Sequence, residues 1–100
     1  MTEFARSMSF EGHPSLAGHF PGNPVIPGVV LLEKVLATCK AWLPELQVSG
    51  LDSVKFLLPV RPGDRFEIAL RRDADDVIRF RCVDGERLFA SGILRCQFRS

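Results

Sequence analysis

The sequence lacks an excess of charge of either sign, since 13 basic and 12 acidic side chains leave a net charge of +1. Domains that hold nucleic-acid phosphates through bulk charge usually carry a clear basic surplus, so this balance argues against a nucleic-acid partner. It leaves room for a small local group of basic side chains. With 100 residues, 46% of them hydrophobic and 25% charged, the composition is that of one globular domain over residues 1–100.

Long hydrophobic runs and metal-binding cysteine patterns are also missing. The longest aliphatic run covers residues 29–32, far short of the roughly 18 residues that a membrane-spanning helix needs. The first ten residues lack the basic and then apolar plan of a secretory signal, so we expect a cytoplasmic protein with no membrane partner. Cys39, Cys82 and Cys96 are odd in number and lack metal-ligand spacing. Buried, reduced thiols and no metal site are therefore expected.

Periodicity predicts an α+β domain in which an antiparallel sheet surrounds one helix. Strands are expected at residues 4–11, 50–60, 65–72, 77–83 and 86–98, the last four as a meander, with Asp84-Gly85 as a two-residue hairpin turn. Between the first strand and the helix, residues 12–28 hold four glycines and four prolines together with several apolar side chains. A rigid, apolar loop of this length is typical of a functional segment.

The helix is expected over residues 28–43, ending before Pro44. Its apolar side chains recur at Val29, Leu32, Leu36, Cys39 and Leu43, and further apolar positions widen this stripe around most of the helix. We therefore expect a buried helix. Lys34, Thr38 and Ala41 mark the face expected to meet water.

Two ionisable side chains lie where charge is costly. His19 is in the apolar loop, and Glu33 borders the apolar stripe of the helix. A histidine and a glutamate that face one apolar slot form a plausible acid/base pair. The alternative for His19 is a loop histidine bonded to a backbone carbonyl. For Glu33 the alternatives are a pair with Lys34 or Lys40 and a solvated charge at the helix edge. Gly28 adds an unobstructed N–H at the positive end of the helix, where oxyanion charge is stabilised.

Residues 18–33, GHFPGNPVIPGVVLLE, resemble the signature of the 3-hydroxyacyl-acyl carrier protein dehydratases of the hot-dog fold. The pattern GHFPGxPxxPGVxxxE is kept with every spacing. The resemblance continues through Val54-Lys55-Phe56 and the turn at Pro62-Gly63-Asp64 to Asp84-Gly85. It departs from the family in its short length and at Ala37, where members often carry glutamine, which leaves the carboxylate of Glu33 without that partner.

The resemblance implies removal of water from a 3-hydroxyacyl thioester, giving a trans-2-enoyl thioester in fatty acid, polyketide or aryl-polyene synthesis. His19 would take the C2 proton, Glu33 would assist the departing C3 hydroxyl, and the Gly28 N–H would bind the thioester carbonyl, with no cofactor. The implied acyl tunnel is lined by Phe20, Val25, Ile26, Pro27, Val29, Phe56 and Leu58.

The implied partners are an acidic acyl carrier protein and a second copy of the chain. In the implied homodimer, or a higher oligomer or heteromer, His19 of one copy meets Glu33 of the other. Lys55, Arg61 and Arg65 are candidate carrier-protein contacts, with an ordinary solvated strand edge as the alternative. Two other functions stay open: a hot-dog acyl thioesterase in which Glu33 activates water, and a non-catalytic subunit that binds acyl carriers.

Overall fold

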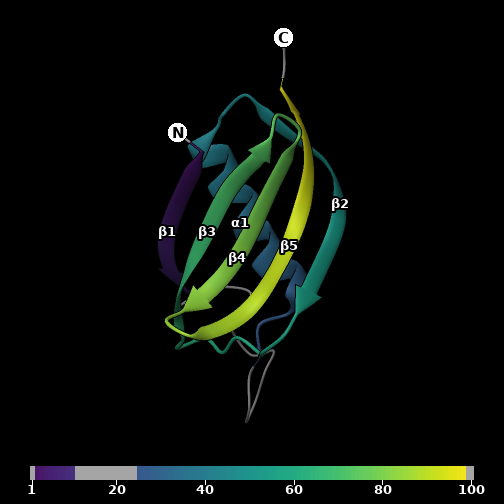
Figure 1. Ribbon diagram of the computed structural model, residues 1–100. Helices are drawn as coiled ribbons and strands as arrows, with labels where there is room; N and C mark the ends of the chain where they lie inside the picture. The colour runs from purple at the N-terminus through teal and green to yellow at the C-terminus, as the bar shows by residue number, and fades with distance from the viewer. Residues whose placement is uncertain (1, 11–24, 99–100) are drawn as a thin grey trace.

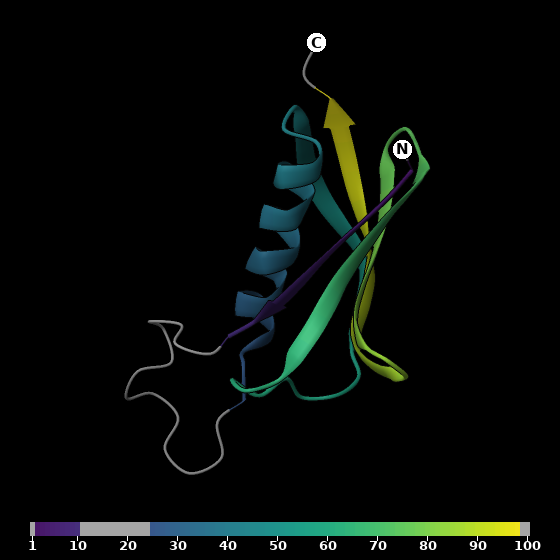
Figure 2. The same cartoon turned by 90° about the vertical axis from the view of Figure 1, so that its left-hand side faces the viewer.

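The computed structural model describes residues 2–10 and 25–98, which form five strands, one helix and the segments that connect them. The elements are β1 (Glu3–Ser9), α1 (Gly28–Trp42), β2 (Leu46–Phe56), β3 (Arg65–Ala74), β4 (Val77–Asp84) and β5 (Arg87–Phe98). The strands form one antiparallel sheet in the order β1-β3-β4-β5-β2 (Figure 1). The sheet curves around α1, which lies along its concave face (Figure 2). The predicted α+β architecture is therefore confirmed.

The central strands follow the period-two pattern of their sequences. On β3 the side chains of Phe66, Ile68 and Leu70 are buried, and the residues between them are more exposed. β4 and β5 continue this inner layer towards α1, because alternate side chains of a strand point to opposite faces of the sheet. The hairpin between β4 and β5 is displaced by one residue from the prediction. Asp84 pairs with Arg87, so the turn residues are 85 and 86, and Gly85 adopts a φ of 60° that favours glycine.

The position and pairing of β2 differ from the prediction. The prediction of a strand at residues 50–60 that pairs in a meander is wrong. The observed strand, β2, covers Leu46–Phe56 and pairs with β5, which is distant in sequence. Its register shifts at Ser49 and again at Asp52, so the alternation that marks the other strands is interrupted. Beyond β2 the chain leaves the regular sheet, and the backbone N–H groups of Leu57 and Leu58 both donate to the carbonyl of Phe89.

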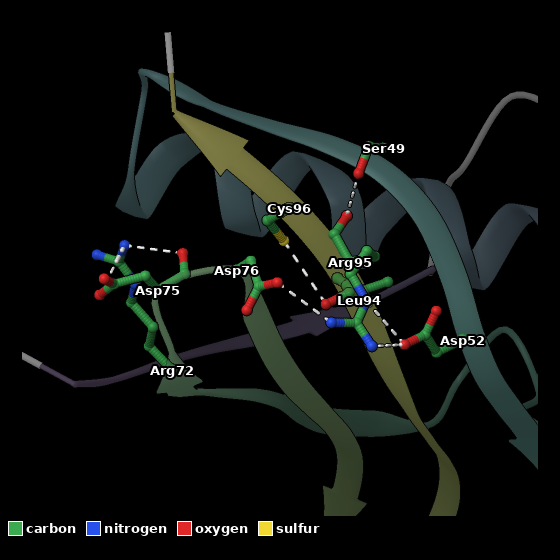
Figure 3. A network of polar contacts seen from close by, with 8 residues as sticks. All are labelled: Ser49, Asp52, Arg72, Asp75, Asp76, Leu94, Arg95 and Cys96. Carbon is green, nitrogen blue, oxygen red and sulfur yellow. Dashed lines mark hydrogen bonds and ion pairs between the residues drawn. The ribbon is translucent and has the colours of Figure 1, made fainter. Parts of the chain in front are cut away.

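Arg95 of β5 is hydrogen-bonded to β2 at both register shifts, at Ser49 and at Asp52 (Figure 3). The Ser49 hydroxyl donates to the Arg95 carbonyl at 3.2 Å, and the Arg95 guanidinium Nε donates to Asp52 at 2.9 Å. A second guanidinium nitrogen, Nη1, donates to Asp76 at 3.2 Å in the turn between β3 and β4. The Arg95 side chain thus joins the edge strand β2 to the turn between β3 and β4, and its backbone carbonyl adds the bond to Ser49.

Helix α1 turns a different face to the sheet from the one expected. Its buried residues are Leu31, Val35, Thr38 and Cys39. Thr38 was expected to meet water and is fully buried; its hydroxyl donates to the Lys34 carbonyl at 2.7 Å, which satisfies the polar group. Ala41 is exposed as expected, whereas Val29 and Leu36 of the expected stripe are 64% and 37% exposed. The expectation of a helix buried on nearly all sides is therefore wrong for the single chain.

Aromatic rings fill the space between the helix and the sheet. Phe66 stacks on Phe10 with ring centroids 5.8 Å apart and meets Phe89 edge-on at 6.1 Å. At the other end of the helix, Phe4 of β1 stacks on Trp42 at 5.9 Å. The three cysteines are free and buried in this core, as predicted. The described helix is too short to cross a membrane.

Candidate active site

The first backbone N–H groups of α1 have no acceptor within the helix. Pro27 precedes the helix with φ −59° and ψ 142°, and no side chain caps the first turn. The Pro27 carbonyl accepts from the N–H groups of Val30 and Leu31 at 3.0 and 3.2 Å. The Ile26 N–H donates to the Val60 carbonyl at 2.7 Å, which anchors the segment leading into the helix. This end of α1 carries the positive end of the helix dipole and lacks an acidic residue in its first turn.

The ring of Phe56, at the end of β2, lies against Gly28. A Cβ atom added to Gly28 would lie 2.7 Å from the Phe56 Cζ, closer than side chains approach one another. Gly28 is therefore a position of close approach, where the missing side chain makes room for an aromatic ring beside the first helical amides. Phe56 is itself 53% exposed, so the ring can be displaced from this position.

An apolar pocket of about 470 Å³ opens where the helix start meets the segment after β2. It is lined by Val25, Ile26, Pro27, Gly28, Leu31, Phe56, Leu57, Leu58, Pro59 and Val60. The structure thus gathers six of the predicted tunnel and carbonyl-binding residues in one place. It does not include Val29, whose side chain is largely exposed. His19 and Phe20 fall outside the described residues.

Leu31, Leu57, Pro59 and Val60 line the same pocket and were not predicted as tunnel residues. For Leu57, Pro59 and Val60, the sequence does contain an indication, the apolar run that follows Phe56. That run was assigned to a strand, in which only alternate residues would share a face. Because residues 57–60 lie outside β2, neighbouring side chains can face the same pocket.

Glu33 lies on the exposed face of α1. One turn after Val29 and one turn before Leu36, it shares their side of the helix, away from the sheet. It does not line the pocket at the helix start. Within the described residues it forms no ion pair with Lys34 or Lys40. Its exposure agrees with the other non-functional alternative, a solvated charge at the helix edge. The Glu33 carboxylate and the apolar pocket therefore lie on different sides of the N-terminal half of α1.

The three basic residues predicted to contact a carrier protein lie in separate places. Lys55 is on β2 and lines a hollow over the outer face of the sheet. Arg65 begins β3 and lines another hollow with Glu67 and Asp84. Arg61 lies in the turn before β3, where its backbone N–H donates to the Asp64 carboxylate at 2.9 Å.

The buried thiols are poor nucleophiles. Burial raises the pKa of Cys39 and of Cys82 to about 12, so both remain protonated near neutral pH. In residues 2–10 and 25–98, no group of three histidine, cysteine or acidic side chains gathers to hold a metal ion.

A sheet wrapped around one helix, with an apolar pocket at the helix start, defines the hot-dog fold, and solved structures of that fold are similar to this chain. The dehydratase heterocomplex ApeI:P from Xenorhabdus doucetiae aligns with a TM-score of 0.83, at 23% identity, over 98% of this chain and 88% of that one. An acyl-CoA hydrolase from Staphylococcus aureus aligns with a TM-score of 0.70 at 16% identity, over 98% and 63% of the two chains. The likeness to these two structures shows the fold alone.

The family follows from sequence: the model of the ApeI dehydratase matches residues 6–93, and the chain belongs to the ApeI-like family. The 3-hydroxyacyl-[acyl-carrier-protein] dehydratase FabZ of Thermomicrobium roseum is 40% identical over 86 residues, covering 73% of this chain and 58% of the relative. FabZ of Caulobacter sp. is 35% identical over 82 residues, covering 70% and 50%. FabZ of Halorhodospira halophila is 35% identical in an alignment that covers 87% of this chain and 67% of the relative. The chain therefore spans half to two thirds of the length of these relatives.

Proposed function

We propose that the protein removes water from 3-hydroxyacyl-acyl carrier protein thioesters in the cytoplasm. The observation that carries the proposal is the apolar pocket at the start of α1, where Gly28, Phe56 and Leu58 come together. The apolar wall of this pocket suits an acyl chain. The backbone N–H groups at the helix start supply the hydrogen-bond donors that a thioester carbonyl requires. Membership of the ApeI-like dehydratase family supports the same chemistry.

In the proposed reaction, His19 takes the C2 proton of the thioester. The negative charge that develops on the carbonyl oxygen is stabilised by the Gly28 N–H and the dipole of α1. The C3–O bond breaks as the hydroxyl receives a proton from Glu33, directly or through a water molecule, and leaves as water. The electron pair of the C2–H bond becomes the C2=C3 double bond. No metal or organic cofactor enters this scheme.

The proposed unit is a pair of copies with shared sites. Because Glu33 does not line its own chain's pocket, the proposal takes the carboxylate of each site from a second copy. Two features support the pairing: β2 is an edge strand of the sheet, and the outer face of α1 exposes Val29 and Leu36. Two such edges placed side by side would continue the sheet through both copies and cover these apolar side chains. A heteromer with a related subunit would use the same edge.

The proposal covers acyl chains of fatty acid, polyketide and aryl-polyene synthesis. The thioesterase alternative has the same pocket, with Glu33 activating water for attack on the thioester carbon. The non-catalytic alternative would retain the carrier protein and lose the chemistry. These three functions differ in product: an enoyl thioester, a free thiol and a fatty acid, or neither.

The test supplies 3-hydroxyacyl thioesters, both carrier-bound and as N-acetylcysteamine esters, with an alkyl or an aryl-polyene chain. Enoyl formation is followed by ultraviolet absorbance and mass spectrometry, and thiol release by a chromogenic disulfide. We expect enoyl product from the wild type, and a loss of at least about a hundredfold in both His19→Ala and Glu33→Gln. Thiol release without enoyl product would instead identify a thioesterase, and absence of both products would favour the binding subunit.

The matched control is Glu45→Gln, which removes an equal charge from another exposed glutamate outside the pocket. It should keep full dehydration. A mixture of inactive His19→Ala and inactive Glu33→Gln protein tests the shared site, since mixed pairs contain one intact site. Recovery of roughly a quarter of the wild-type rate is expected from random pairing, and no recovery would contradict sharing between copies.

A further inference from the structure

The outer face of the sheet carries a cluster of basic side chains around Ser91 of β5. Ser91 pairs with Lys55 of β2 on one side and with Arg81 of β4 on the other. Arg79, two residues before Arg81 on β4, points to the same face, because the buried residues of β4 are Ile78, Phe80 and Cys82. We call Lys55, Arg79 and Arg81 the basic cluster.

The cluster surrounds a hollow of about 360 Å³ on that face. Besides the three cations, the hollow is lined by Ser53, Phe80, Leu88, Ser91, Gly92 and Ile93. Two serine side chains therefore lie among the cations, and hydroxyls of this kind donate to anionic oxygens. The combination suits an acidic surface with some apolar area and not a purely apolar partner.

Most cations near this cluster are neutralised within the chain, but two members of the cluster are not. Asp73 pairs with both Arg71 and Arg79, and Arg95 pairs with Asp52 and Asp76. In the described part of the chain, no carboxylate lies within ion-pair distance of Lys55 or Arg81. These two cations are exposed and flank the same serine, which leaves a local positive surplus in a protein of net charge +1.

The cluster is also close to the candidate active site. Lys55 is the residue before Phe56, whose ring lies against Gly28 on the helix side of the sheet. A partner seated on the outer face at Lys55 is therefore next to the end of β2, whose last residue, Phe56, lines the pocket. Its flexible arm would pass around that end of the strand. The pairing edge of β2 and the outer face of α1 stay free for a second copy of the chain.

We propose that the basic cluster of Lys55, Arg79 and Arg81 is the docking surface for an acidic protein, the carrier that delivers the acyl thioester. The inference rests on the proposed function, because the carrier is the partner which that function requires. It keeps Lys55 from the sequence-based candidates and groups it with Arg79 and Arg81 in place of Arg61 and Arg65. The attraction is electrostatic and sets the rate of encounter and the KM, while the chemical step depends on the pocket.

The test compares two substrates that share a 3-hydroxyacyl chain and differ in its carrier. In Lys55→Glu/Arg81→Glu, the KM for the carrier-protein substrate should rise about tenfold or more, with kcat almost unchanged. The kinetic constants for the N-acetylcysteamine ester should stay within about twofold of the wild type. Added salt should raise the wild-type KM for the carrier substrate, and should not raise it further in the double variant.

Arg6→Glu is the matched control, since Arg6 is an exposed cation on the opposite edge strand, β1. It should leave both substrates unaffected. An unchanged carrier KM in Lys55→Glu/Arg81→Glu would overturn the proposal, and so would a larger effect of Arg65→Glu. Equal loss with both substrates would also overturn it, because that pattern indicates damage to the pocket. A rise in KM confined to a coenzyme A ester would assign the surface to nucleotide phosphates and reject the carrier.

Direct binding separates this inference from the proposed activity. Fluorescence anisotropy of a labelled holo-carrier protein is measured with the wild type and the double variant. If the wild type dehydrates neither substrate, the proposed function is wrong, yet binding that is lost in the double variant still supports the docking surface. Equal binding of the wild type and the variant overturns the surface, whatever the activity.

Discussion

The Phe56 ring lies so close to Gly28 that the first residue of α1 has no room for a side chain: an added Cβ would be 2.7 Å from the ring's Cζ. The contact joins the end of the edge strand β2 to the start of the helix. It also places an aromatic wall beside the backbone donors proposed to bind the thioester. A methyl group at this position therefore tests the local geometry of the site.

Gly28→Ala should reduce kcat/KM for dehydration by about tenfold or more, because the displaced ring alters how the thioester is seated. The unfolding free energy should change by less than about 1 kcal/mol, since alanine favours the helix while the half-exposed ring moves aside. Steady-state kinetics and urea unfolding measure the two effects. Gly63→Ala is the control, because nothing lies within 4 Å of its added Cβ. Unchanged activity in Gly28→Ala would mean that the contact does not shape the site.

Gly92→Ala should destabilise the fold by about 1–3 kcal/mol, the usual cost of forcing extra atoms into a packed interior. Its Cβ would meet both the Phe80 ring and the Ser53 carbonyl oxygen at 2.4 Å, and a backbone oxygen cannot turn aside as a side chain can. Chemical unfolding at neutral pH checks the prediction. Gly50→Ala offers the comparison, because its nearest new contact is the Arg95 Cβ at an ordinary 3.9 Å. Equal midpoints for the two variants would show that the sheet can relax around residue 92.

Leu36→Glu and Leu51→Glu should each weaken self-association. Leu36 lies on the outer face of α1 and Leu51 on the edge strand β2, at 37% and 49% exposure, so a charge there costs the single chain little. Burying the same charge between two copies is costly. Sedimentation velocity should show dissociation together with loss of dehydration. Ala5→Glu, on the other edge strand, is expected to change neither, and if it dissociates the assembly as strongly, the pairing edge is β1.

Raising the pH above about 9 should destabilise the protein through its cysteines. The pKa of Cys39 and of Cys82 rises from 9.0 to about 12 because of burial. Between those values the unfolded chain releases protons that the folded chain keeps, so stability is full below pH 9 and declines as pH rises towards 12. Urea midpoints at pH 7, 9 and 10.5 measure the decline. In Cys39→Ala/Cys82→Ala the decline should be smaller, and an equal decline would exclude thiol ionisation as its source.

Local signals in the sequence account for most of the elements but not for the way they assemble. β3 and β4 alternate cleanly, and their expected faces are correct. The prediction gave β2 the wrong bounds and the wrong partner. Its true partner, β5, is distant in sequence, and the alternation of β2 is interrupted at Ser49 and Asp52. No local sequence pattern predicts that Arg95 forms hydrogen bonds with both of these residues.

The helix shows why part of the site could not be predicted. Apolar residues surround most of α1, so its sequence does not say which of them meet the sheet and which are exposed in the single chain. The expected stripe combined residues of both kinds, and Thr38 was placed on the wrong side. Gly28 was found from its position at the helix start, whereas its contact with Phe56 depends on where β2 ends.

The pairing of β2 with β5 also has a consequence for synthesis on the ribosome. About 30 residues separate the end of β2 from the start of β5, and chains grow at about 5–20 residues per second. For a period of seconds, β2 has been made and its partner has not. During this interval the nascent chain exposes the unpaired strand β2 and the apolar face of α1, because most of the sheet that buries this face has not yet formed. Exposed apolar segments of this kind are prone to aggregation, so slower synthesis of residues 57–86 would lengthen the interval in which the chain needs protection.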